Sequence, residues 1–271
     1  MKPHLQAMNG NPSLEQRYRA VKLRIERAAA AAGRDPRAVR LLAVSKTFPA
    51  GTVGELASLG QDAFGENYLQ EALAKIASLA HLRPGWPSQP SPGSVPAMDQ
   101  AMTRRSIEWH FIGPIQSNKT RRIAESFDWV QSVDSERIAR RLSEQRPPHL
   151  PPLQVCLQVN VSGEATKSGC EPHEVVPLAQ ALAALTGIRL RGLMAIPEPT
   201  DDHALQAKRF AQVRELFDRV RESLEDSGSA GAGHLDTLSM GMSADLEAAI
   251  AAGATIVRVG SALFGERPGK Y

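Results

Sequence analysis

The chain has 271 residues, of which 42% are hydrophobic, and a formal net charge of +3. This length suffices for one α/β barrel or two small domains, and the hydrophobic content excludes a largely disordered chain. The 32 basic residues are nearly balanced by 29 acidic ones, and no basic stripe is interleaved with aromatic residues. We therefore expect no nucleic acid among its partners.

Metal binding, secretion and membrane insertion are also disfavoured. The two cysteines, Cys156 and Cys170, do not form a CxxC pair, so we expect no metal site, and their low number suits a reducing compartment. The first residues lack the apolar stretch of a signal peptide, and no apolar run approaches the roughly 20 residues of a membrane span. We expect a cytoplasmic monomer without membrane contacts.

The first predicted element is an amphipathic helix over residues 14–32. Ser13 and Gln16 have the spacing of a capping box, and apolar residues recur every three or four positions from Leu14 onward. Gly33 follows as a C-terminal stop signal.

Short apolar segments then alternate with helical patterns. Eight such units predict a single (β/α)8 TIM-type barrel, with residues 1–271 forming one domain. A doubly wound sheet is the alternative, but no GxGxxG turn follows the first strand. The predicted strands are centred on residues 41–45, 62–65, 108–112, 129–132, 153–161, 188–194, 237–240 and 255–259.

The segment 83–105 interrupts this alternation. Its first part, RPGWPSQPSPGSVP, contains five prolines and has no helical or strand periodicity. We expect a mobile loop at the barrel rim, and we interpret it as a neutral insertion rather than a functional lid.

Lys46 is the first candidate site residue. It directly follows the first predicted strand, and the C-terminal ends of barrel strands carry the reactive groups in enzymes of this architecture. A lysine between an apolar strand and a tight turn is partly desolvated, which favours Schiff-base formation. A solvated lysine at a strand end is the alternative.

Two glycine–serine turns follow the last two predicted strands, at Met240–Ser243 and Val259–Ser261. Phosphate sites in such barrels recur at these positions, where backbone N–H groups point at the anion. We expect Ser243 to occupy the N-cap position of the helix over residues 244–250 and Ser261 to open a short helix. Gly260 allows close approach of the backbone. An amine and a phosphate cradle together match pyridoxal 5'-phosphate, although each turn alone could be merely structural.

Arg258 lies within an apolar strand, and alternation places it on the opposite face from Val257 and Val259. If those two residues face the outer helices, Arg258 points into the barrel. A buried arginine requires a partner, which could be the nitrogen of a pyridine ring or a carboxylate of the barrel.

Six segments occur in order along the chain: AVSKTFPA (43–50), FGENYLQE (64–71), WHFIGPIQSNK (109–119), VNVSGEATKSG (159–169), LRGLMAI (190–196) and residues 238–265. Together they resemble the pyridoxal phosphate homeostasis protein family, which is related to the barrel domain of alanine racemase. The resemblance implies one barrel that holds the cofactor as a Schiff base on Lys46. It implies phosphate contacts at Ser243, Gly260 and Ser261, a contact of Arg258 with the pyridine nitrogen, and positions at the pocket for Asn67 and His110. Met240, which opens the first glycine–serine turn, is a further candidate for cofactor binding. From the residues alone, a lone strand histidine such as His110 is more often a hydrogen-bonded core residue.

Two functions are compatible with such a site. The first is a non-enzymatic carrier that buffers pyridoxal phosphate and delivers it to apo-enzymes. The second is an amino-acid racemase, which needs a base on each face of the cofactor. Related racemases supply one base as a tyrosine from a second domain, and of the tyrosines here only Tyr68 lies near a strand end. We therefore favour the carrier. The sequence leaves open whether Lys167 forms a second cofactor site.

Overall fold

The structure is a computed structural model that describes residues 11–83, 106–163, 168–229 and 231–265. Within these residues, eight parallel strands form a closed barrel, in which each strand pairs with its neighbours along the chain and the last pairs with the first. The fold is therefore the predicted (β/α)8 barrel. The strands are β1 (Arg40–Val44), β2 (Ala63–Glu66), β3 (Glu108–Phe111), β4 (Trp129–Val133), β5 (Leu153–Val159), β6 (Ile188–Ala195), β7 (Thr237–Ser239) and β8 (Ile256–Val259).

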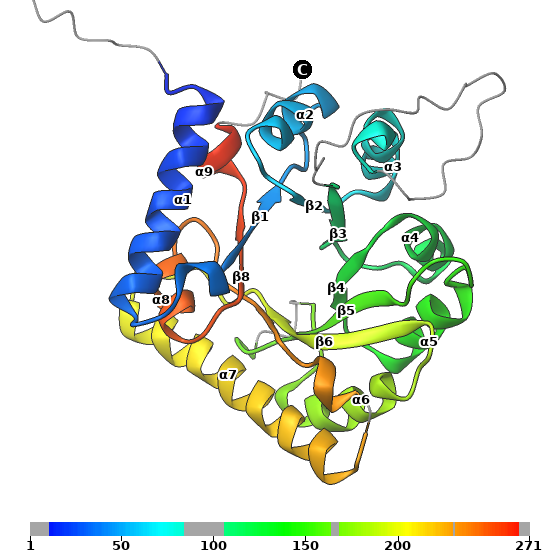
Figure 1. Ribbon diagram of the computed structural model, residues 1–271. Coiled ribbons are helices and arrows are strands. Elements are labelled where there is room, and N and C mark those ends of the chain that lie inside the picture. The colour runs from blue at the N-terminus through cyan, green and yellow to red at the C-terminus, as the bar shows by residue number, and fades with distance from the viewer. Residues whose placement is uncertain (1–10, 84–105, 164–167, 230, 266–271) are drawn as a thin grey trace, which may run out of the picture.

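Helices surround the strands on the outside of the barrel (Figure 1). The α-helices are α1 (Leu14–Ala31), α2 (Ala50–Ser58), α3 (Leu69–Ser78), α4 (Thr120–Ser126), α5 (Glu136–Gln145), α6 (Val175–Ala183), α7 (His203–Asp226), α8 (Leu246–Ala251) and α9 (Ser261–Phe264). Short 3-10 turns occupy Pro36–Ala38, Ala80–Leu82, Ser117–Lys119, Pro172–Glu174 and Ala232–His234.

The N-terminal helix α1 forms as predicted. The Ser13 hydroxyl accepts a hydrogen bond from the Gln16 amide at 3.2 Å, and the Gln16 side chain accepts one from the Ser13 amide at 2.8 Å. Gly33 follows the helix with a φ of 67°, in the left-handed region that glycine tolerates.

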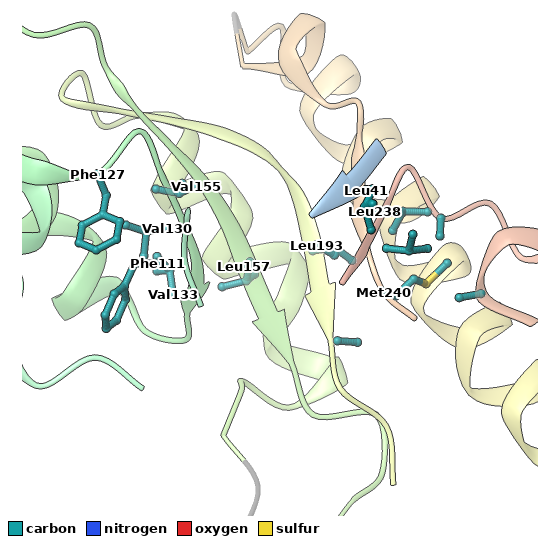
Figure 2. Close-up of a cluster of buried hydrophobic side chains, with 14 of the residues drawn as sticks. Leu41, Phe111, Phe127, Val130, Val133, Val155, Leu157, Leu193, Leu238 and Met240 are labelled. Atoms are coloured by element: carbon teal, nitrogen blue, oxygen red, sulfur yellow. The ribbon is translucent and has the colours of Figure 1, made fainter. Parts of the chain in front are cut away.

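Side chains alternate between the barrel interior and the layer beneath the helices. Outward-facing residues of successive strands join the helices in one large hydrophobic cluster, part of which is drawn in Figure 2. Phe111 and Val130 lie in this outer layer beside Phe127. Leu42 and Ile256, on the other face of β1 and β8, pack in a separate cluster with Ala63. The interior and the outer layer therefore pack as separate clusters.

The predicted loop over 83–105 lies outside the described residues except for Arg83. Arg83 is buried and does not belong to a surface loop. Its guanidinium pairs with Asp128 at 2.5 Å and donates to the Ser126 carbonyl at the end of α4. The residues on the two sides of this segment lie side by side, because the Ile107 amide donates to the Leu82 carbonyl at 2.9 Å.

Among the described helices, none has the length and apolar character required to cross a bilayer. In the same residues, no three His, Cys, Asp or Glu side chains are grouped so as to hold a metal ion.

Gly192 and Gly54 provide a matched test of the barrel packing. A Cβ atom at Gly192 would lie 1.8 Å from the Thr237 carbonyl oxygen, whereas one at Gly54, within α2, would lie at an ordinary 3.5 Å from Leu79. We expect Gly192→Ala to lower the free energy of unfolding by about 1–3 kcal/mol or more. Gly54→Ala should raise it by about 0.5–1 kcal/mol. Urea denaturation of both variants checks this, and equal effects would contradict the packing.

Candidate functional site

A cavity of about 300 Å³ opens at the C-terminal ends of the strands. This volume is at the lower end of the range for small-molecule sites, about 300–1,000 Å³. Six of the eight predicted site residues line it. The described lining residues are Val44, Lys46, Asn67, Ile112, Met194, Ile196, Met242, Ser243, Ala244, Arg258, Gly260 and Ser261.

Lys46 enters the cavity from the turn that follows β1. Its side chain is half-buried, and strand alternation places it on the same side as Val44, which also lines the cavity. The next residue, Thr47, has a φ of 70°, a left-handed conformation that no other non-glycine residue adopts in the part of the chain described. A β-branched residue is strained there, so the surrounding structure must hold this turn in place.

The two glycine–serine turns also reach the cavity, with one difference from the predicted geometry. Helix α8 begins only at Leu246, and Asp245 occupies its N-cap position. The Asp245 carboxylate accepts a hydrogen bond from the Met242 amide at 2.6 Å. Ser243 is therefore not a helix cap, and it faces the cavity from the preceding turn. Ser261 does open the short helix α9, as predicted.

Glycine is required in the first of these turns. Gly241 has a φ of 91°, and a Cβ atom there would lie 2.5 Å from the Cβ of Ala249. In the second turn, Gly260 packs against the Val44 backbone. The Cβ of a larger residue at position 260 would lie 3.4 Å from the Val44 carbonyl oxygen, which is an ordinary van der Waals distance, so glycine is not sterically required there.

Helix α1 braces both turns through two arginines. Arg24 donates to the Ser243 carbonyl at 2.7 Å and pairs with Glu247 at 2.5 Å. Arg17 donates to the Leu263 carbonyl at 2.7 Å, at the end of α9. The N-terminal helix thus contacts the first turn directly and the second through the helix α9 that follows it.

Arg258 is buried and points inward, as the strand alternation predicted. Its guanidinium donates to the Ser239 carbonyl at 2.6 Å, to the Ser239 hydroxyl at 2.8 Å and to the Ala195 carbonyl at 2.8 Å. These partners are neutral oxygens, so the alternative of a paired carboxylate is not what the structure has. Burial lowers the pKa of Arg258 to about 10, which leaves it a cation at neutral pH.

His110 and Met240 are the two predicted site residues that the structure does not bring to the cavity. Met240 faces outward and packs with Leu238 in the large hydrophobic cluster, because alternate positions in a strand share one face (Figure 2). His110 faces the interior but lies fully buried, stacked on Trp129 with ring centroids 5.1 Å apart.

A chain of hydrogen bonds connects His110 with Arg258 through the barrel interior. The Ser239 hydroxyl, which accepts from Arg258, donates to Gln131 Oε1 at 2.7 Å. Gln131 Nε2 donates to His110 Nδ1 at 2.9 Å, so the His110 proton lies on Nε2, which donates to Glu108 at 2.8 Å. His110 thus supports Arg258 from below the cavity.

Sequence reasoning missed the apolar walls of the cavity. Met194 and Ile196 occupy alternate, inward-facing positions at the end of β6 and just after it. Ile112 occupies the equivalent position directly after β3. Strand alternation extended past each predicted strand end would have found them.

Comparison with known proteins places the chain in a family. Residues 17–268 match the model of the alanine racemase N-terminal domain. The chain is 56% identical to the pyridoxal phosphate homeostasis protein of Pseudomonas aeruginosa, over 91% of this chain and 93% of that protein. It is 44% identical to the protein of the same name from Escherichia coli, over 91% and 94%. The chain belongs to the pyridoxal phosphate homeostasis protein family. This confirms the resemblance found in the sequence motifs.

Solved structures agree with this assignment. PipY of Synechococcus elongatus with pyridoxal phosphate bound has a TM-score of 0.71 and 32% identity, over 93% of this chain and 100% of that one. A protein of unknown function from Bifidobacterium adolescentis has a TM-score of 0.79 and 34% identity, over 93% and 94%. Alanine racemase of Corynebacterium glutamicum, at 17% identity and a TM-score of 0.58, shares the fold, and this chain covers 62% of it.

The interior carboxylate Glu108 generates a pH prediction. Burial opposes its ionisation, but the hydrogen bond from His110 and the Arg40 guanidinium at 2.5 Å outweigh burial and lower the Glu108 pKa from 4.5 to about 2. A lowered pKa stabilises the fold at pH values above 4.5, and this contribution, at most about 3 kcal/mol, is lost as the pH falls toward 2.

We therefore expect Glu108→Gln to be less stable than the parent protein at pH 7, with a difference that narrows below about pH 4.5. Urea unfolding at pH 7, 5 and 4 measures this. Glu26→Gln, at an exposed glutamate of α1, is the control for the loss of a surface carboxylate. A difference that stays constant between pH 5 and 4 would count against a lowered pKa.

Proposed function

We propose that this protein binds pyridoxal 5'-phosphate at the C-terminal mouth of the barrel, with Lys46 as the covalent attachment point, and that it acts as a carrier in cofactor homeostasis. The observation that supports this most directly is one cavity lined by both Lys46 and the two glycine–serine turns at Ser243 and Ser261. Names of relatives such as the Pseudomonas aeruginosa homeostasis protein support the same function.

The residues of the cavity fit this cofactor. Pyridoxal phosphate supplies an aldehyde that condenses with an amine to form a Schiff base, and a phosphate that anchors it. Lys46 provides the amine, and the serine hydroxyls and turn amides provide donors for an anion. Asn67 Oδ1 is buried without a hydrogen-bond partner among the described residues, which leaves an acceptor for a ligand donor.

Arg258 has a specific role in this proposal. It is a cation held by three hydrogen bonds to neutral oxygens, and it lines the cavity. A permanent donor of this kind opposite a pyridine nitrogen disfavours protonation of that nitrogen. A ring left unprotonated withdraws electrons weakly, so Arg258 favours holding the cofactor over catalysis on it.

The racemase alternative lacks a second base in the described cavity. Tyr68 is 56% exposed and lines a neighbouring cavity with Lys119, and Tyr18 lies on α1 at the other end of β1. Tyr271 is outside the described residues. Neither described tyrosine lines the cavity that contains Lys46. The family names of the relatives, which denote homeostasis proteins, agree with a non-enzymatic carrier.

We also propose that residues 1–271 form one domain, which acts as a monomer in the cytoplasm and passes the cofactor to apo-enzymes. The two free cysteines, Cys156 and Cys170, are buried, and burial raises the pKa of each to about 12, as suits thiols that stay reduced.

The covalent attachment can be tested by trapping. After loading with pyridoxal phosphate and reduction with borohydride, peptide mass spectrometry should find the label on Lys46, and Lys46→Ala should lose it. Lys22→Ala is the control, because Lys22 lines a separate cavity of about 490 Å³ between α1 and β1 and should not affect labelling. A label of the parent protein that maps to another residue would overturn the assignment.

The carrier and the racemase differ in proton exchange at the α-carbon of amino acids. We expect the loaded protein to show no more than a trace of the exchange of a genuine racemase with D- or L-alanine in deuterium oxide, because lack of one base should cost on the order of 10²–10⁴ in rate. NMR measures the exchange. Racemisation at a rate comparable to the enzyme, abolished in Lys46→Ala, would favour the racemase.

A further inference from the structure

A buried ionic cluster lies behind the turn that carries Lys46. It consists of Glu66 at the end of β2 and of Glu71 and Lys75 on α3. The Lys75 ammonium contacts Glu66 Oε1 at 2.7 Å and Glu71 Oε1 at 2.6 Å. The side chains of Lys75 and Glu66 are 6% and 0% exposed, and that of Glu71 is 30% exposed. None of the three lines the cavity.

The cluster holds the backbone on both sides of Lys46. On one side, Lys75 donates to the Ser45 carbonyl at 2.7 Å, and the Ser45 hydroxyl donates to Glu66 at 2.6 Å. On the other side, the Thr47 amide donates to Glu71 Oε1 at 2.6 Å. Glu71 therefore holds the one non-glycine residue with a left-handed φ in the described parts of the chain.

Stability alone does not account for this cluster. Buried ion pairs contribute little net stability, because the desolvation of the charges offsets their attraction. Burial raises the pKa of Glu66, although Lys75 and Ser45 oppose that rise. Glu66 Oε2 has no hydrogen-bond partner among the described residues, so the cluster is not fully satisfied. A strained turn, in contrast, requires such a set of fixed contacts to persist.

We propose that Glu71 is a positioning residue: through the Thr47 amide and Lys75 it fixes the turn that directs the Lys46 amine into the cavity. This inference rests on the proposed function, in which Lys46 is the attachment point. Glu71 does not touch the cofactor site itself. It acts through the backbone, which sets the starting position and direction of the Lys46 side chain.

Two substitutions at the same position separate this role from general stabilisation. Glu71→Ala removes the acceptor of the Thr47 amide, whereas Glu71→Gln keeps an amide oxygen that can accept from both Thr47 and Lys75. Two readouts are measured. The first is the rate of covalent capture of pyridoxal phosphate, followed by absorbance and by borohydride trapping on Lys46. The second is the affinity for pyridoxine 5'-phosphate, which has the ring and the phosphate but no aldehyde.

We expect Glu71→Ala to slow covalent capture by about tenfold or more, since misplacement of a reacting group by about 1 Å can cost on the order of 10²-fold in rate. Glu71→Gln should stay within about threefold of the parent protein. Both variants should bind pyridoxine 5'-phosphate as the parent does, because Ser243, Ser261 and Arg258 are unchanged.

Equal capture rates in Glu71→Ala and the parent protein would overturn the inference, as would equal slowing by alanine and glutamine. If Glu71→Ala loses pyridoxine 5'-phosphate binding through unfolding, Glu71→Asp replaces it. That variant keeps the negative charge, but its side chain is one methylene shorter and draws the carboxylate away from the Thr47 amide, so unchanged capture in it would overturn the inference. A parent protein that never labels Lys46 would instead overturn the proposed function on which the inference rests.

Discussion

The parallel pairing of β1 with β8 is the contact on which the candidate site depends. Leu42 pairs with Arg258 and Ala43 pairs with Val259, so the two strands end at the same level of the barrel. Lys46, from the first strand, therefore enters the same cavity as Gly260, which follows the last strand. If the barrel did not close, the amine and the second glycine–serine turn would lie on opposite edges of an open sheet.

Much of this arrangement could be predicted from the sequence, because periodicity in the chain corresponds directly to geometry. The eight predicted strands all form, with ends shifted by up to two residues. The period-two alternation of β8 correctly placed Arg258 inward, opposite in direction to Val257 and Val259. Alternation also explains Met240, which shares the outward face of Leu238, so the same rule would have moved it from the cavity to the core.

What the sequence did not reveal depends on contacts between distant segments. Nothing in its own segment distinguishes Lys75 from a solvated helix lysine, and its burial arises only when α3 packs against the end of β1. The position of His110 likewise depends on Gln131 of β4, which binds one ring nitrogen, whereas Glu108, which binds the other, lies on the same strand as His110. The start of α8 differs from prediction because Asp245, rather than Ser243, occupies its cap position.

The central claim is that the cavity containing Lys46 holds pyridoxal phosphate between the amine and the two glycine–serine turns. A crystal structure of the cofactor-loaded protein tests it most directly. We predict electron density continuous with Lys46 Nζ and a phosphate group beside Ser243 and Ser261. Density for the cofactor in the cavity at the other end of β1, beside Lys22, or a phosphate group away from both turns, would contradict the account.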